Sequence, residues 1–262
     1  MGAPELREWL LRARHADGSL GYAPSDPGVP EPTLHAVAAG LPVPTAWLST
    51  AELGWSTWFA PAALLGRPEA DPVRQAAIAT TLTAKGKTVT ETVGDYDGTI
   101  AGWTWIPDTF SWVEPTAWAI VGLSASGHGE HERVREGRRL LRNRQGADGG
   151  WNYGNPNVLG AQLPAYPHST AIALLALPPG PDADRAWTCL ERIVSTLPSA
   201  LNLALSVLAS VAHHRDPTAF ADSLAARQRS DGSLTGRNHI DALALLAMTA
   251  SQTGSHPYAI HG

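Results

Sequence analysis

The sequence contains a single cysteine, Cys189, among its 262 residues. One cysteine excludes an intramolecular disulfide framework and any metal site that needs two thiolates. The segment around it reads as an outer helix, where we expect a buried structural thiol. Charged residues make up only 16% of the chain and no run of Lys and Arg occurs, so a nucleic-acid-binding surface is not indicated.

Long hydrophobic runs are also missing. No segment reaches the ~18 unbroken apolar residues that a transmembrane helix needs. The first residues, MGAPELREWLL, contain acidic side chains and no apolar signal core, and Leu6 occupies the position where a myristoylation motif requires Ser or Thr. We therefore expect a cytoplasmic protein.

Trp, Gly and Pro are abundant by contrast. The chain has 10 Trp against 3 Phe and 5 Tyr, together with 25 Gly and 21 Pro. Gly and Pro at this density punctuate many short elements. With 44% hydrophobic residues, the length suffices for one large core, and we predict a single domain over residues 1–262.

An Asp-Gly turn recurs along the chain, at Asp17-Gly18, Asp97-Gly98, Asp148-Gly149 and Asp231-Gly232. The first and last spacings, 80 and 83 residues, are each about twice a period of roughly 40. Degenerate copies near 50–55 and 195–200 would complete six units.

Each unit combines one charged amphipathic helix with one helix that is apolar nearly all round. This alternation predicts an all-α fold, an α/α toroid of about six helical hairpins with buried helices inside and half-exposed helices outside. Neither end offers a polar capping unit, which favours a closed ring over an open solenoid. The expected inner helices are 31–40, 55–66, 114–123, 168–177, 199–211 and 239–248, and the outer helices are 4–14, 44–53, 71–82, 131–145, 182–194 and 216–228.

The segment RQGADGGW (144–151) resembles the Q-x-x-x-G-x-W repeat of squalene cyclases and protein prenyltransferase β subunits, in the terpene-cyclase and prenyltransferase repeat family. Gln145, Gly149 and Trp151 occupy its three marked positions, and a partial copy lies at 228–234. The resemblance implies the toroid fold and a structural role for Gln145 and Trp151 in tying neighbouring outer helices together. The fold hosts many chemistries, so function has to be argued from the site.

The segment WVEPTA occupies the place of the D-x-D-D-T motif with which class II terpene cyclases protonate an alkene or epoxide. Glu114 matches the central acid and Thr116 the final Thr, whereas Trp112 and Pro115 replace the flanking acids. A carboxyl desolvated in an apolar ring has a raised pKa and can act as a general acid. A carboxylate at a helix N-terminus is instead stabilised in its charged form, which opposes that role.

Other polar residues open inner helices at equivalent places. Glu31 does so in the first unit, His168 in the fourth and His239 in the sixth, and His35 lies one turn into the first. In a closed ring these side chains converge with Glu114 at one mouth, where a carboxylate–His set could transfer protons. We predict no cofactor and no metal, because no metal-ligand spacing occurs.

Aromatic residues around these positions could line a cavity for an apolar or cationic ligand, or simply fill the core. The long loops 84–112 and 152–167 could cover the mouth of the ring. The candidate substrate-binding residues are Trp55, Trp58, Trp103, Trp105, Trp112, Trp118 and Tyr166, with Glu31, His35 and His239.

The resemblance and the candidate site predict a terpene-cyclase-like enzyme, of isomerase or lyase type, acting on an apolar isoprenoid or polyene-type molecule by proton transfer and cation chemistry. Glu114 and His168 are the predicted catalytic residues. The alternatives are a non-catalytic binding protein for a lipid-like ligand or peptide, and a scaffold subunit of a biosynthetic complex. Cyclases of this class commonly pair two such rings, so a single ring implies a smaller substrate, a protein partner or a second copy.

Overall fold

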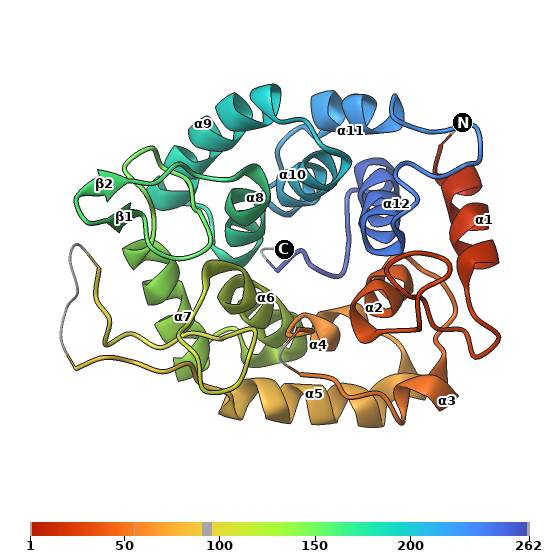
Figure 1. Cartoon of the computed structure of the whole chain (residues 1–262), viewed down its shortest axis with the longest axis horizontal. Helices are drawn as coiled ribbons and strands as arrows, with labels where there is room; N and C mark the ends of the chain where they lie inside the picture. The colour runs from red at the N-terminus through yellow and green to blue at the C-terminus, as the bar shows by residue number, and fades with distance from the viewer. Residues whose placement is uncertain (1, 55, 91–95, 261–262) are drawn as a thin grey trace.

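Two concentric rings of helices make up the fold (Figure 1). The computed structural model describes residues 2–54, 56–90 and 96–260. The inner ring comprises α2 (Pro30–Ala38), α4 (Ala60–Ala63), α6 (Val113–Leu123), α8 (Pro167–Ala176), α10 (Ala200–Ala212) and α12 (Asn238–Thr253). The outer ring comprises α1 (Ala3–Ala13), α3 (Thr45–Leu48), α5 (Asp71–Thr83), α7 (Glu132–Asn143), α9 (Pro181–Thr196) and α11 (Thr218–Ala225).

The inner helices close into a ring. Each contacts the next, from α2 through α4, α6, α8 and α10 to α12, and α12 returns to contact both α2 and α1. In α8 every residue except His168 is buried, which explains why the sequence of this helix is apolar on all sides. The expected α/α toroid is therefore confirmed.

The second hairpin is shorter than the sequence predicts. Helices expected over 44–53 and 55–66 are present only as α3 and α4, of four residues each. Pro61 lies in the first turn of α4. Proline has no N–H to donate within a helix and its ring clashes with the preceding turn, so the helix begins only just before this residue. Gly66 follows shortly with a φ of 71°, which is incompatible with helix continuation.

The repeat motif ties neighbouring units together, as the resemblance implies. The side-chain amide of Gln145 donates to the carbonyl of Gly149 at 2.7 Å and to that of Asp182, in the first turn of α9, at 2.8 Å. Trp151 is fully buried, and its indole N–H donates to the carbonyl of Leu141 at 2.7 Å. These contacts join the end of α7 to its own loop and to the next outer helix.

The copy of this motif around Gln228 joins the two ends of the ring. Its amide donates to the carbonyl of Gly232 at 3.2 Å and to that of Gly2, the residue before α1, at 3.1 Å. The bond to Gly2 links the sixth unit directly to the first.

A threonine in the first turn of an inner helix holds the preceding loop in three of the units. Each of these hydroxyls makes two hydrogen bonds to the backbone of a single loop residue: it accepts from the N–H and donates to the carbonyl. The threonines are Thr33, Thr116 and Thr170. In α12, Asp241 replaces this threonine and accepts the N–H groups of Thr235 and Gly236. The loop residues held by threonine are Leu20, Trp103 and Trp151, at N···O distances of 2.9, 3.0 and 3.0 Å.

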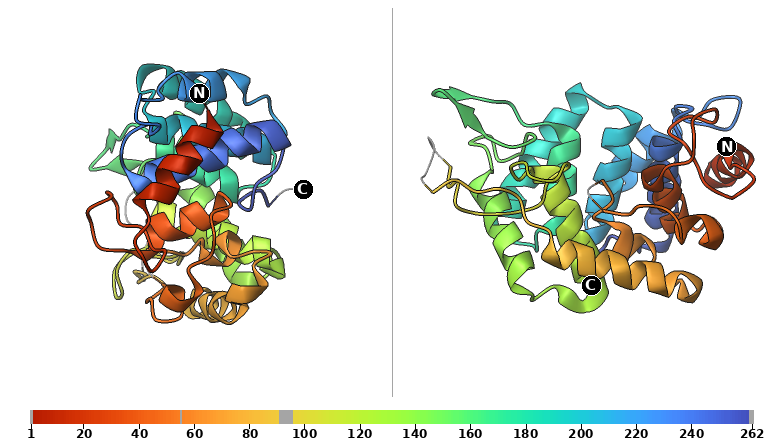
Figure 2. Two further views of the ribbon diagram at one scale, coloured as in Figure 1. Left: turned by 90° about the vertical axis from the view of Figure 1, so that its right-hand side faces the viewer. Right: turned by 60° about the horizontal axis from the view of Figure 1, so that its bottom comes forward.

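Short elements decorate the loops between hairpins. A two-stranded antiparallel sheet, β1 (Asn157–Val158) and β2 (Ala161–Gln162), projects from the ring beside α8 (Figure 2). A 3-10 turn, η1 (Pro68–Ala70), precedes α5, and a π-helical turn, η2 (Ser124–His128), follows α6. The role of the loops as a lid stays a prediction, and residues 91–95 lie outside the described part of the chain. No helix among the described residues is long and apolar enough to cross a membrane.

Substituting Gln228 tests the ring closure. We expect Gln228→Ala to lower the free energy of unfolding by about 1–3 kcal/mol, because two hydrogen bonds of about 0.5–1.5 kcal/mol each are lost. Gln252 is exposed on α12, and Gln252→Ala serves as the control, with an expected change below ~0.5 kcal/mol. Urea denaturation of the three proteins measures this, and equal stability of the two variants would contradict a closing role for Gln228.

A second prediction concerns His256, whose pKa is lowered from 6.5 to about 4 by burial. Below pH 6.5, His256 binds a proton in the unfolded chain but stays neutral in the folded chain. The free energy of unfolding therefore falls as the pH drops. At about 1.4 kcal/mol per pH unit, this effect lowers the free energy of unfolding by about 2 kcal/mol between pH 6.5 and pH 5. Chemical denaturation at both pH values should show that the free energy of unfolding of His256→Gln falls by about 2 kcal/mol less than that of the wild type. The same pH dependence in both proteins would refute the prediction.

Candidate functional site

One cavity of about 370 Å³ receives side chains from the first turn of five inner helices. They are Glu31 of α2, Glu114 of α6, His168 of α8, Leu201 of α10 and His239 of α12. The N-terminal ends of these helices therefore lie at one end of the ring, which we call the mouth. The volume is at the small end of the ~300–1,000 Å³ typical of ligand pockets.

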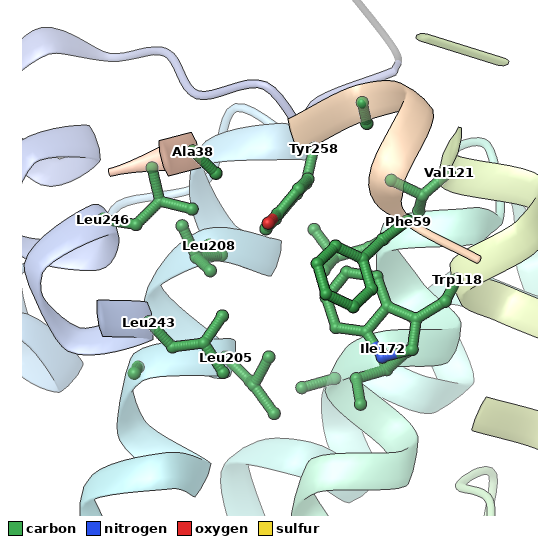
Figure 3. Close-up of a cluster of buried hydrophobic side chains, with 14 of the residues drawn as sticks. Ala38, Phe59, Trp118, Val121, Ile172, Leu205, Leu208, Leu243, Leu246 and Tyr258 are labelled. Carbon is green, nitrogen blue, oxygen red and sulfur yellow. The ribbon is translucent and has the colours of Figure 1, made fainter. Parts of the chain in front are cut away.

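Below the mouth the cavity is apolar. Ile172, Leu205 and Leu243 form its walls, and the ring of Trp118 lines it with His35 at what we call the floor (Figure 3). Trp105 also lines it, from the loop before α6. A ligand with an apolar body would lie among these side chains and present one end to the polar mouth.

Glu114 and His168 form a pair at the mouth. Nε2 of His168 lies 3.1 Å from Oε1 of Glu114, and the hydroxyl of Ser169 donates to the same oxygen at 3.1 Å. Both members of the pair are partly buried. The sequence places Glu114 and His168 on different helices 54 positions apart, and the ring closure brings them together.

Glu31 has different surroundings. It lies at the start of α2 and accepts a hydrogen bond of 2.5 Å from the phenol of Tyr22. Burial raises the pKa of Glu31, the hydrogen bond from Tyr22 partly offsets this, and the charge of Glu114 raises the pKa further. The carboxylic acid form is thus favoured at Glu31 relative to a carboxyl in water.

Two histidines of the cavity are held neutral. Burial, with a smaller contribution from His239, lowers the pKa of His35 to about 3. Burial and the charge of Arg237 lower the pKa of His239. The ring of His239 contacts the edge of the Tyr22 ring, and its buried Nδ1 has no hydrogen-bond partner among the described residues. His239 therefore has an unused polar atom beside the mouth.

The predicted tryptophans divide into two groups. Trp105 and Trp118 line the cavity. The ring of Trp118 is also 5.8 Å from that of His35 and 5.2 Å from that of Phe59. Trp55 lies outside the described residues.

Three other predicted tryptophans lie outside the cavity lining. Trp58 and Trp103 are fully buried, and their indole N–H groups donate to the carbonyls of Thr104 and Thr81 at 2.9 and 2.8 Å. These rings pack into the wall, because each indole N–H finds a carbonyl there. Trp112 is 42% exposed and lines a separate pocket with Phe110, outside the ring mouth.

Tyr166 lies beside the mouth and not in the cavity lining. Its ring stacks on that of His168 at 6.0 Å and contacts Tyr153 at 5.0 Å. The sequence interpretation missed Tyr153 and Tyr22. Both stand four residues after the glycine of an Asp-Gly turn, so the repeat register contains a signal that could have found them.

Metal binding gains no support from the arrangement of ligands. Within residues 2–54, 56–90 and 96–260, no three His, Cys, Asp or Glu side chains are grouped so that they could hold a metal ion. Cys189 is buried in α9, away from the cavity lining.

The raised pKa of Glu31 predicts a pH-dependent stability. The folded chain holds a proton on Glu31 above pH 4.5, the ordinary pKa, that the unfolded chain releases, so this residue destabilises the fold as the pH rises. Glu31→Gln keeps an acceptor for Tyr22 and cannot ionise. We expect its free energy of unfolding, relative to the wild type, to increase from pH 4 to pH 7 in denaturation experiments; a constant or decreasing difference would contradict this.

The solved structures similar to this chain include two of the type II terpene cyclase MstE from Scytonema, as variants in complex with the substrate geranylgeranyl dihydroxybenzoate. Each is 14% identical with a TM-score of 0.44, and the match covers 98% of this chain and 75% or 76% of those chains. No protein-family model and no curated protein sequence matches the chain. Similarity at this level says nothing about the ligand or the reaction of this protein.

Proposed function

We propose that this protein is a terpene-cyclase-like enzyme that binds an apolar isoprenoid or polyene-type molecule in the ring and moves protons at the mouth. The observation that carries the proposal is the meeting of two unlike carboxyls, Glu31 and Glu114, over an apolar cavity of about 370 Å³. Neighbouring titratable groups whose environments differ are the usual basis for a division into acid and base.

Glu31 is the proposed proton donor. Its raised pKa keeps a larger share of the carboxylic acid than a carboxyl in water would have. Glu114, which as a predicted catalytic residue could serve as proton donor or base, is the proposed base together with His168, because its Oε1 is already within hydrogen-bonding distance of both His168 and Ser169.

The proposed reaction is an isomerisation. Glu31 gives its proton to one carbon of an alkene, and the π electrons form the new C–H bond and leave a cation on the neighbouring carbon. Trp105 and Trp118 stabilise that cation by ~0.5–2 kcal/mol each. The Glu114–His168 pair then removes a proton from an adjacent carbon, whose C–H electrons form a new double bond. The product has the formula of the substrate. Glu31 then takes a proton from water, and the Glu114–His168 pair returns its proton to water.

The alternative is a binding protein without chemistry, and one observation favours it. The flanking acids of the cyclase motif are replaced by Trp112 and Pro115, so Glu114 lacks the additional carboxyl groups that tune the acid in the resembled family. The same cavity would then hold a lipid-like molecule unchanged.

Incubation with polyene isoprenoids in D₂O separates the two functions. We expect a product isomer that carries one deuterium at carbon, detected by mass spectrometry, because the acid of Glu31 exchanges with solvent. Glu31→Gln should abolish the product, and Glu114→Gln should slow its formation by ~10²-fold or more. Glu8→Gln, at an exposed position of α1, is the matched control. If the wild type and all the variants return the bound starting material without deuterium, the enzymatic function is overturned and the binding function is supported.

A further inference from the structure

The segment after α12 folds back into the ring at the end opposite the mouth. Gly254 ends α12 in a left-handed conformation with a φ of 72°, which allows the chain to reverse. Residues 255–257, 259 and 260 then share a surface pocket with Leu65 and Ser124, which follow the C-terminal ends of α4 and α6. Figure 1 shows this end of the chain at the centre of the ring.

His256 fixes the segment to α10. Its Nε2 lies 2.9 Å from the carbonyl of Leu208. Since a carbonyl can only accept, Nε2 carries the hydrogen, and Nδ1 is free to accept the backbone N–H of Tyr258 at 3.2 Å. One neutral imidazole thus sets the position of Tyr258.

Tyr258 is fully buried behind the cavity lining (Figure 3). Its ring meets those of Trp118 and Phe59 edge-on, at 5.2 and 5.9 Å, and its hydroxyl lies 2.9 Å from Nδ1 of His35. Trp118 and His35 both line the cavity. Tyr258 therefore supports the two side chains that form the cavity floor.

We infer that Tyr258 sets the depth of the cavity and so limits the length of the apolar chain that the protein accepts. This rests on the proposed function in so far as it requires an apolar ligand, but it does not depend on the chemistry. A ligand with its reactive end at Glu31 and Glu114 extends toward Trp118 and His35. The close packing behind them gives these rings no room to retreat.

Calorimetric titration with geraniol, farnesol and geranylgeraniol tests the inference, because these alcohols differ by one isoprene unit at a time. In the wild type we expect affinity to fall at least tenfold once a chain exceeds the cavity. Tyr258→Ala should move that limit to a longer alcohol, because apolar voids of about 150 Å³ accept groups as large as benzene. Tyr258→Phe retains the ring and should keep the limit of the wild type.

Tyr258→Leu serves as a second, less disruptive truncation if the alanine variant does not fold, which thermal melting reports. A folded truncated variant that keeps the wild-type limit overturns the inference and leaves the proposed apolar ligand intact. Failure of every alcohol to bind the wild type and the variants overturns the apolar ligand itself, and the inference with it.

Discussion

A threonine hydroxyl that pairs with both the N–H and the carbonyl of one loop residue determines the geometry of the mouth. In α6, Thr116 holds Trp103 in this way, and Glu114 lies two residues earlier in the same turn. Because the threonine is turned outward to the loop, the residue two positions before it is turned toward the ring centre. The pairing recurs in α2 and α8, and Asp241 takes its place in α12. One local hydrogen-bond pattern, repeated around the ring, therefore brings the polar side chains together.

The mouth and the floor of the cavity differ in polarity for separate reasons. The N-terminal ends of inner helices meet at the mouth and place carboxyl and imidazole side chains there. The floor lies deeper in the ring, where His35 and Tyr258 are fully buried and hydrogen-bonded to each other. A ligand with one reactive end and an apolar body fits this gradient in a single orientation, which is what selective proton transfer requires.

The sequence could predict the mouth and the two floor residues His35 and Trp118, but not the side chain that packs behind them. The repeat period alone identified Glu31, Glu114, His168 and His239 as equivalent positions, because closure of the ring follows from the alternation of helices. The repeat period does not predict where a tryptophan ring packs. The position of the ring depends on which backbone carbonyl accepts its indole N–H, as the bond from Trp103 to Thr81 shows. Tyr258 follows the last repeat and contacts His35, which lies 223 positions earlier in the sequence, so no local sequence pattern predicts this contact. The shortening of α4 has a local cause, Pro61 in its first turn and Gly66 shortly after it, that the hydrophobic pattern of the segment does not express.

Glu31 and Glu114 share one mouth in different surroundings, and burial raises the pKa of Glu31. Infrared spectroscopy measures this directly, through the C=O stretch of a carboxylic acid followed from pH 4 to pH 7. We expect a band that persists above pH 4.5 and disappears in Glu31→Gln. In Glu114→Gln its titration should shift to lower pH, because the charge of Glu114 raises the pKa of Glu31. A spectrum in which Glu31→Gln removes no band above that pH would contradict the assignment of Glu31 as the acid and remove the basis for proton transfer at this site.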